Sequence, residues 1–146
     1  MKVSRRDLSR LLPALAVTEL AVTELRSQDK RMMTTRAFPY EDLPVKVNGQ
    51  NKGRAVFDGE NHLGFPVELH MTELGPGQIP HPPHQHPHEE VLMLRRGVLD
   101  ATFGGKTTRL NAGSVIYVGS GELHGWKNPG PEPAEYFVIA LGKGKG

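Results

Sequence analysis

The chain has 146 residues, of which 37% are hydrophobic and 23% charged, a balance that fits one folded globular domain. The formal net charge is only +2, and the basic residues gather near the two ends, so nucleic-acid binding has little support. The absence of cysteine excludes disulfides and thiolate metal ligands, and no apolar run approaches the roughly 18 residues that a membrane-spanning helix requires.

Residues 1–30 differ from the rest of the chain and are predicted to be an export signal or an N-terminal extension. Arg5 and Arg6 form a twin-arginine pair, a short apolar run follows, and residues 14–16 have the small-x-small form of a cleavage site. This segment resembles a bacterial twin-arginine signal, and the resemblance implies a periplasmic protein. The alternative is a cytoplasmic protein with a basic N-terminal extension.

Residues 31–66 are predicted to form an N-terminal arm. Two short candidate strands, residues 45–47 and 54–57, are bounded by Asn-Gly and Asp-Gly turn signals. Apolar and polar residues alternate too little along these strands for the arm to build a core of its own. We therefore expect the arm to pair with the sheet edge of a second subunit. The sequence therefore predicts a homodimer.

From residue 67 onward short strands alternate with turns, which suits a chain with 17 glycines and 12 prolines. In residues 67–74 the apolar Val67, Leu69 and Met71 alternate with polar residues, so we expect the apolar side to be buried and His70 to be a surface or strand histidine. The other expected strands are residues 90–94, 98–103, 106–110, 114–118, 124–128 and 136–141. This rhythm predicts an antiparallel β-sandwich or barrel over residues 67–141, followed by a disordered tail at 142–146.

Histidines gather in one stretch of the chain. Four of the seven lie close together and a glutamate pair follows them: His81, His84, His86 and His88, then Glu89 and Glu90. Neutral imidazoles beside a carboxylate suit a divalent first-row metal. A histidine-rich surface tract would produce a similar cluster, so the stretch alone does not decide between the two.

A second stretch, residues 113–128, makes the pattern specific. Together the two stretches resemble the two signature motifs of the cupin superfamily, which are small jelly-roll barrels. The residues that match the first motif are Gly77, His84, His86, Glu90 and Gly97, and the spacer after Gly77 is one residue longer than usual. The residues that match the second motif are Gly113, Gly121, His124 and Asn128, and Gly119 stands in place of the family's proline. The resemblance covers about residues 67–141 and implies an all-β cupin barrel of antiparallel strands.

The resemblance also implies a divalent metal ion (Mn, Fe, Ni or Zn) held by His84, His86, Glu90 and His124. The spacing agrees, because residues two apart on extended backbone point the same way, and Glu90 shares the parity of the first two histidines. A register that pairs His86 with His88 would need a carboxylate near position 92, which is a leucine. We therefore expect His88 at the rim of the site or behind a ligand.

Several other side chains are candidates for the surroundings of the site. Trp126 shares parity with His124 and is expected either to line a pocket or to pack in the core. Tyr117 and Phe103 are expected in the core, and Arg95 or Arg109 could bind an acid at the rim.

Two functions from different classes follow from the resemblance. The first is a metalloenzyme that acts on a small polar molecule as a dioxygenase, isomerase or lyase. The second is a non-catalytic module that binds a metal or a small molecule. No residue occupies a clear general-base position, and a fold alone does not name a reaction.

Overall fold

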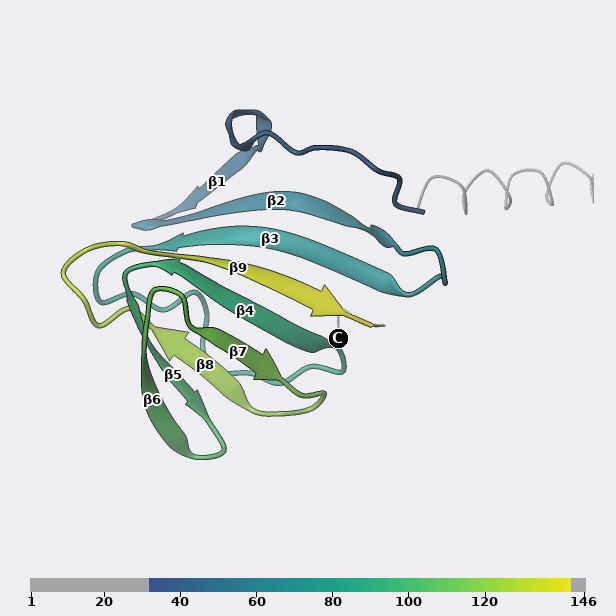
Figure 1. Ribbon diagram of the computed structural model, residues 1–146. Coiled ribbons are helices and arrows are strands. Elements are labelled where there is room, and N and C mark those ends of the chain that lie inside the picture. The colour runs from purple at the N-terminus through teal and green to yellow at the C-terminus, as the bar shows by residue number, and fades with distance from the viewer. Residues whose placement is uncertain (1–31, 143–146) are drawn as a thin grey trace, which may run out of the picture. The chain divides into compact units, whose positions relative to one another are not determined.

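The computed structural model describes residues 32–142, so the predicted export signal and residues 143–146 of the predicted tail lie outside the described residues. Within this range the strands form two antiparallel sheets, with the orders β1-β2-β3-β9-β4-β7 and β6-β5-β8 (Figure 1). The strands are β1 (Val45–Asn48), β2 (Asn51–Glu60), β3 (Pro66–Leu74), β4 (Glu89–Arg96), β5 (Val98–Phe103), β6 (Lys106–Asn111), β7 (Val115–Val118), β8 (His124–Lys127) and β9 (Ala134–Leu141). One short 3-10 helix, η1 (Tyr40–Asp42), precedes them. The predicted all-β jelly-roll architecture is confirmed.

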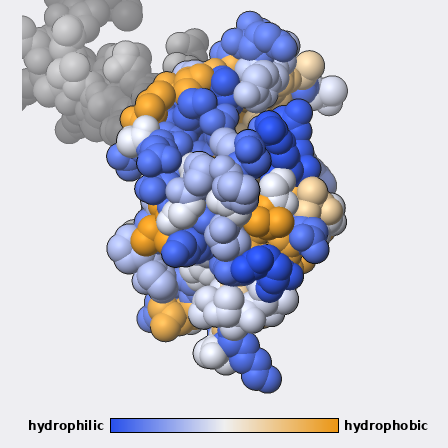
Figure 2. Space-filling model, turned by 90° about the vertical axis from the view of Figure 1, so that its left-hand side faces the viewer, coloured by the Kyte–Doolittle hydropathy of each residue, from blue (hydrophilic) through white to orange (hydrophobic). Residues whose placement is uncertain are grey.

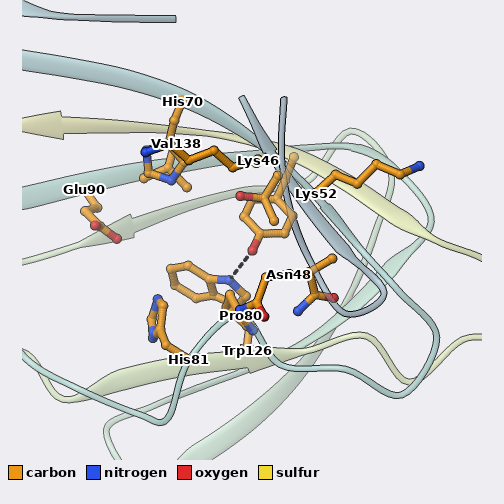
Figure 3. A pocket seen from close by; sticks show the side chains of 13 residues that line it. Lys46, Asn48, Lys52, His70, Pro80, His81, Glu90, Trp126 and Val138 are labelled. Carbon is orange, nitrogen blue, oxygen red and sulfur yellow. Dashed lines mark hydrogen bonds between the residues drawn. The ribbon is translucent and has the colours of Figure 1, made fainter. Parts of the chain in front are cut away.

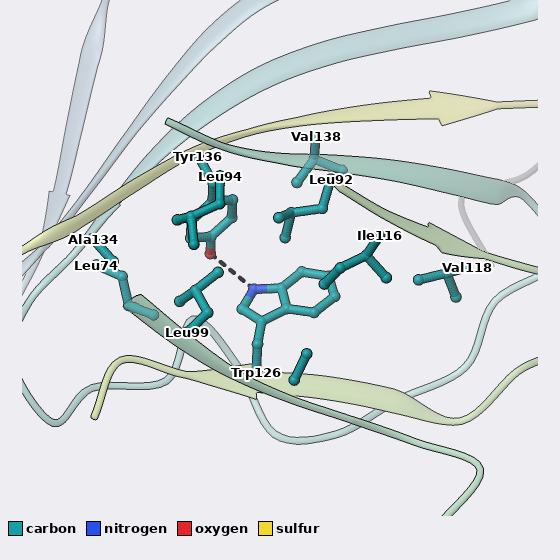
Figure 4. Packing of buried hydrophobic residues seen from close by; sticks show 11 residues of the cluster. Leu74, Leu92, Leu94, Leu99, Ile116, Val118, Trp126, Ala134, Tyr136 and Val138 are labelled. Carbon is teal, nitrogen blue, oxygen red and sulfur yellow. Dashed lines mark hydrogen bonds between the residues drawn. The ribbon is translucent and has the colours of Figure 1, made fainter. Parts of the chain in front are cut away.

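The hydrophobic core lies between the two sheets (Figure 4). In the larger sheet, Leu92 of β4 stands in register with Val138 of β9, and both are almost fully buried. Trp126 of β8 enters the core from the smaller sheet and donates a hydrogen bond from Nε1 to the Tyr136 hydroxyl, at 3.0 Å. This bond ties the two sheets together at their buried faces.

The loop after β8 is held by one buried side chain, Asn128. Its amide nitrogen donates to the carbonyls of Leu74, Gly75 and Glu132, and its amide oxygen accepts from the Gly130 backbone. Because a buried amide is costly unless it is hydrogen-bonded, this residue has a structural role that fixes three chain segments together.

The predicted arm pairs differently from our expectation. β2 pairs with β3 of its own chain from Lys52↔Glu73 to Glu60↔Pro66, with a bulge between Ala55 and Phe57. The turn that joins them is closed by Asn61, whose side-chain oxygen accepts from two backbone amides. Since β3 offers a free edge only a short turn away, β2 extends well beyond the predicted residues 54–57 and needs no second subunit as its partner.

The apolar side of β3 is buried in part, as expected, with Met71 8% exposed, but the side that faces the other sheet is the polar one. His70 and Thr72 face the space between the sheets, in register with Val138 and Tyr136. Leu69 and Met71 face the other side of the sheet, where residues 38–43 of the arm lie over them. β3 is therefore partly buried on both sides, and its inner side is polar where it lines a cavity.

Two aromatic residues expected in the core are on the outside. Tyr117 is 62% exposed and Phe103 is 37% exposed. On β7 the inward positions belong to Ile116 and Val118, whereas Tyr117 pairs with Val91 on the outer face of the sheet. The apolar side chains of β7 therefore lie on both faces of an edge strand, and only those of Ile116 and Val118 enter the core.

The surface is mixed in polarity. On the face that Figure 2 shows, hydrophobic patches lie among hydrophilic residues that cover most of the surface. Within residues 32–142, no helix has the length and apolar character needed to cross a membrane.

Candidate metal centre

The four predicted ligands come from three segments that the fold brings together. Glu90 lies on β4 of the larger sheet, and His124 is the first residue of β8 in the smaller sheet. His84 is bound to His124 by a two-way backbone bridge, with both N···O distances 3.0 Å. His86 lies in the loop between this bridge and β4. The site therefore lies where the two sheets meet at one end of the barrel.

Their polar atoms converge. Glu90 Oε1 is 3.2 Å from His86 Nε2, and Glu90 Oε2 is 3.6 Å from His124 Nε2. One ring nitrogen from each of His84, His86 and His124 lies within 4.8 Å of the others. Three of the four residues are buried, with His124 only 1% exposed. The structure thus brings all four predicted ligands into one cluster.

The backbone fixes the tautomers of two histidines. Nδ1 of His86 lies 2.8 Å from the carbonyl of His88, and Nδ1 of His124 lies 2.8 Å from the carbonyl of Glu122. A carbonyl oxygen can only accept, so both Nδ1 atoms carry the proton. In a neutral ring the lone pair is then on Nε2, which is the atom that faces Glu90.

Three ring nitrogens in this cluster are buried without a hydrogen-bond partner among the described residues: His84 Nδ1, His86 Nε2 and His124 Nε2. An unpartnered buried polar atom costs about 1–3 kcal/mol. Burial and the neighbouring His81, His124 and His86 lower the pKa of His84 to about 4, so its ring is neutral at pH 7. Unpartnered ring nitrogens beside a carboxylate are the donor set of a divalent metal site, and these residues therefore fit a metal ion.

His88 contacts the cluster through both Glu90 and His86. Its Nε2 lies 3.2 Å from Glu90 Oε1, and its ring stacks on His86 with centroids 3.6 Å apart. His86, His88 and Glu90 form a second group of potential metal ligands that overlaps the first. Leucine at position 92 does not prevent this arrangement, because both groups can use the same carboxylate.

A cavity of about 300 Å³ adjoins the cluster. Glu90, His81 and Trp126 line the side next to the histidines, so Trp126 both packs in the core and borders the cavity. Figure 3 shows Glu90 on one side, with Lys52 and Asn48 across from it. The cavity gives a small molecule access to the carboxylate of the candidate metal centre.

Sequence reasoning missed His70 as a cavity residue. It lines the cavity from β3, and burial lowers its pKa against the opposing effect of Glu68. Its parity with Leu74, which is fully buried, was the signal that this side of β3 faces inward.

The two arginines considered for acid binding are engaged elsewhere. Arg95 pairs with Glu135 at 3.3 Å, and Arg109 pairs with Asp100 of the neighbouring strand β5. Neither lines the cavity beside Glu90.

Comparison with known families agrees with this geometry. Residues 70–140, which include all four candidate ligands, match the model of the cupin domain. The matched segment is just under half of the chain, and the match supports membership of the cupin superfamily. No curated protein sequence matches the chain at a significant level.

Solved structures show the same cupin fold at low identity. An RmlC-like cupin from Shewanella frigidimarina is 18% identical, with a TM-score of 0.62, over 76% of this chain and 95% of that one. The polyketide cyclase RemF from Streptomyces resistomycificus is 20% identical, with a TM-score of 0.62, over 75% and 80%. A predicted oxalate decarboxylase from Thermotoga maritima is 15% identical, with a TM-score of 0.63, over 74% and 100%.

Proposed function

We propose that this cupin is a metal-dependent enzyme that acts on a small polar molecule by dioxygenase, isomerase or lyase chemistry. The observation that carries the proposal is the convergence of three histidines on Glu90, which lines the wall of a cavity. A bound Mn, Fe, Ni or Zn ion would supply Lewis-acid chemistry and, in the case of iron, redox chemistry.

The residues of this chain have distinct tasks in such an enzyme. His84, His86, His124 and Glu90 would hold the ion, and the carbonyls of His88 and Glu122 keep two of the rings in the required tautomer. Three neutral imidazoles and one carboxylate leave a divalent ion with a net charge near +1, which favours a polar or anionic substrate.

The cavity walls would position that substrate and limit its contact with water. Trp126 and Val138 provide apolar surface, while His70 and Thr72 provide hydrogen-bonding groups on β3. Sites of this kind combine a mostly apolar lining with a few polar groups that orient the ligand. Two neighbours bear enzyme names, a polyketide cyclase and a predicted oxalate decarboxylase, but their identity is too low to select a reaction.

The test is metal analysis of protein purified without oxygen, followed by turnover assays. Oxygen uptake would be measured against catechols, β-diketones, keto acids and sugar acids, and product formation would be followed by NMR for isomerase and lyase reactions. We expect a stoichiometric divalent metal and turnover that is lost in His124→Ala. Metal binding without turnover of any compound would instead support the non-catalytic binding module, and protein that binds no metal would refute the metal-dependent enzyme.

A further inference from the structure

The charges around the cavity are unequal. Its lining contains two lysines, Lys46 and Lys52, and a single carboxylate, Glu90. In the proposed function Glu90 binds the metal, so the ion compensates the negative charge of its carboxylate. With a divalent ion in place, the cavity is net positive.

The two lysines are not equivalent. Lys52 donates a hydrogen bond to Glu73 Oε1 at 2.7 Å, which neutralises much of its charge. Lys46 makes no ion pair with any residue of the described range 32–142. It is therefore the cation available to a ligand in the cavity.

The strand register directs Lys46 toward the cavity. Lys46 of β1 stands opposite Gly53 of β2, which stands opposite Thr72 of β3 and, beyond it, Tyr136 of β9. Neighbours in register share a face of the sheet, and all four residues line the cavity. A Cβ at Gly53 would meet no atom within 4 Å, so the absence of a side chain there leaves open space beside Lys46.

Hydrogen bonds hold the β1–β2 hairpin, which carries Lys46, against the segment that contains Gly75 and Ile79. At its turn, Asn51 donates a hydrogen bond to the Ile79 carbonyl and accepts one from the Gly75 backbone. The turn also packs so closely that a Cβ at Gly75 would lie 2.7 Å from the Gln50 Cβ. Lys46 is thus part of a fixed wall. This wall comes from residues before the matched segment 70–140.

We infer that the site takes a small organic carboxylate, whose acid group pairs with Lys46 of the β1–β2 hairpin while its other end faces the metal at Glu90. The inference rests on the proposed function, since the net positive charge requires the metal. An ammonium pairs with a carboxylate or phosphate as a point charge, and the cavity volume of about 300 Å³ restricts the ligand to a small one.

The test measures binding of acids and their neutral analogues to metal-loaded protein by isothermal titration calorimetry. The pairs are succinate with succinamide, glutarate with glutaramide and galacturonate with galactose, and inorganic phosphate is a separate probe. We expect at least one acid to bind more tightly than its neutral partner. Lys46→Gln should reduce the affinity for that acid about tenfold, as loss of one charged hydrogen bond predicts.

Two controls separate the role of Lys46 from direct binding of acids to the metal. Lys106→Gln removes a lysine from the distant β5–β6 hairpin and should leave affinity unchanged at equal metal occupancy. Gly53→Leu should fill the cavity and abolish binding, whereas Val47→Leu, on the exposed face of the same hairpin, should not.

The outcomes distinguish this inference from the proposed function. The carboxylate inference is wrong, and the metal centre stands, if wild-type protein binds metal but prefers no acid over its neutral partner. It is also wrong if Lys46→Gln and Lys106→Gln bind the preferred acid equally well. Preference for phosphate over every carboxylate also overturns it. If the wild type binds no metal, the proposed function fails and the inference fails with it.

Discussion

The carboxylate of Glu90 lies with Oε1 3.2 Å from His86 Nε2, although a bend separates the loop that carries the histidine from β4. The other oxygen of the same carboxylate faces the histidine that begins β8 in the opposite sheet. One carboxylate therefore faces ring nitrogens from two separate segments, and a metal ion held there would connect β4 with β8 of the opposite sheet.

The hydrogen bond between Trp126 and Tyr136 is expected to contribute stability and not metal affinity. Burial raises the pKa of the Tyr136 hydroxyl to about 12, so it remains protonated. Trp126→Phe removes the donor and leaves space beside this hydroxyl, which should lower the free energy of unfolding by about 1–3 kcal/mol. The chain has one tryptophan, so urea unfolding should be followed by circular dichroism. Unchanged stability, or a large loss of metal, would contradict this role.

Metal-free protein is expected to lose stability as the pH falls. The folded-state pKa of His84 is about 4 and its ordinary value is 6.5, because burial and the nearby His81, His124 and His86 outweigh the opposing effect of Glu90. Between these values the unfolded chain binds more protons, so stability is greatest above pH 6.5 and decreases toward pH 4. His70, whose pKa burial also lowers, acts in the same direction.

Thermal unfolding with a chelator present, measured from pH 7.5 to pH 4, tests this dependence. The melting temperature should fall over that range, and His84→Gln should make the fall shallower. His62→Gln, which changes an exposed turn residue, should reproduce the wild-type profile. A flat wild-type profile, or an equal slope in His84→Gln, would contradict the assignment.

Much of the fold and the ligand set could be predicted from sequence because both depend on local spacing. The strands of the barrel follow from short apolar runs between turns, and His84, His86 and Glu90 share one parity along the chain. The inward direction of His70 is indicated only by its parity with Leu74, which is a weaker signal. Its strand is covered on both faces, so hydrophobic alternation pointed to the outer side under residues 38–43.

The role of the arm also lay beyond sequence reasoning. Its position depends on which sheet edge is free, and pairing with β3 places Lys46 beside the cavity. Nothing in the spacing of Lys46 relative to the histidines indicates this, because they meet only through the order of strands in the sheet.

The homodimer remains a prediction, now with a different physical reason. The larger sheet ends at β1 and β7, which leave unpaired backbone groups at its edges. On β7, Val115 and Tyr117 are each 62% exposed. Sedimentation should show a dimer at micromolar concentration, and Tyr117→Lys should shift it toward monomer while Thr107→Lys on the other sheet should not. A stable wild-type monomer would refute the prediction.

Export also remains a prediction, since residues 1–31 are outside the described range. If the first 30 residues form a twin-arginine signal, a reporter fused to them should appear in the periplasm, shortened by the leader. Replacing Arg5 and Arg6 with lysine should hold the fusion in the cytoplasm. An unmodified fusion that stays full-length and cytoplasmic would show that the segment is only an extension.

Metal occupancy of histidine variants tests the central claim most directly. Elemental analysis should find that His84→Ala and His124→Ala each lose most of the metal while circular dichroism shows an intact barrel, because each residue supplies a buried nitrogen at the centre. His88→Ala should keep nearly the wild-type content, since His88 is not one of the four predicted ligands and the substitution keeps the backbone carbonyl that accepts from His86 Nδ1. Equal metal loss in His88→Ala and His84→Ala would contradict the assignment of the four ligands.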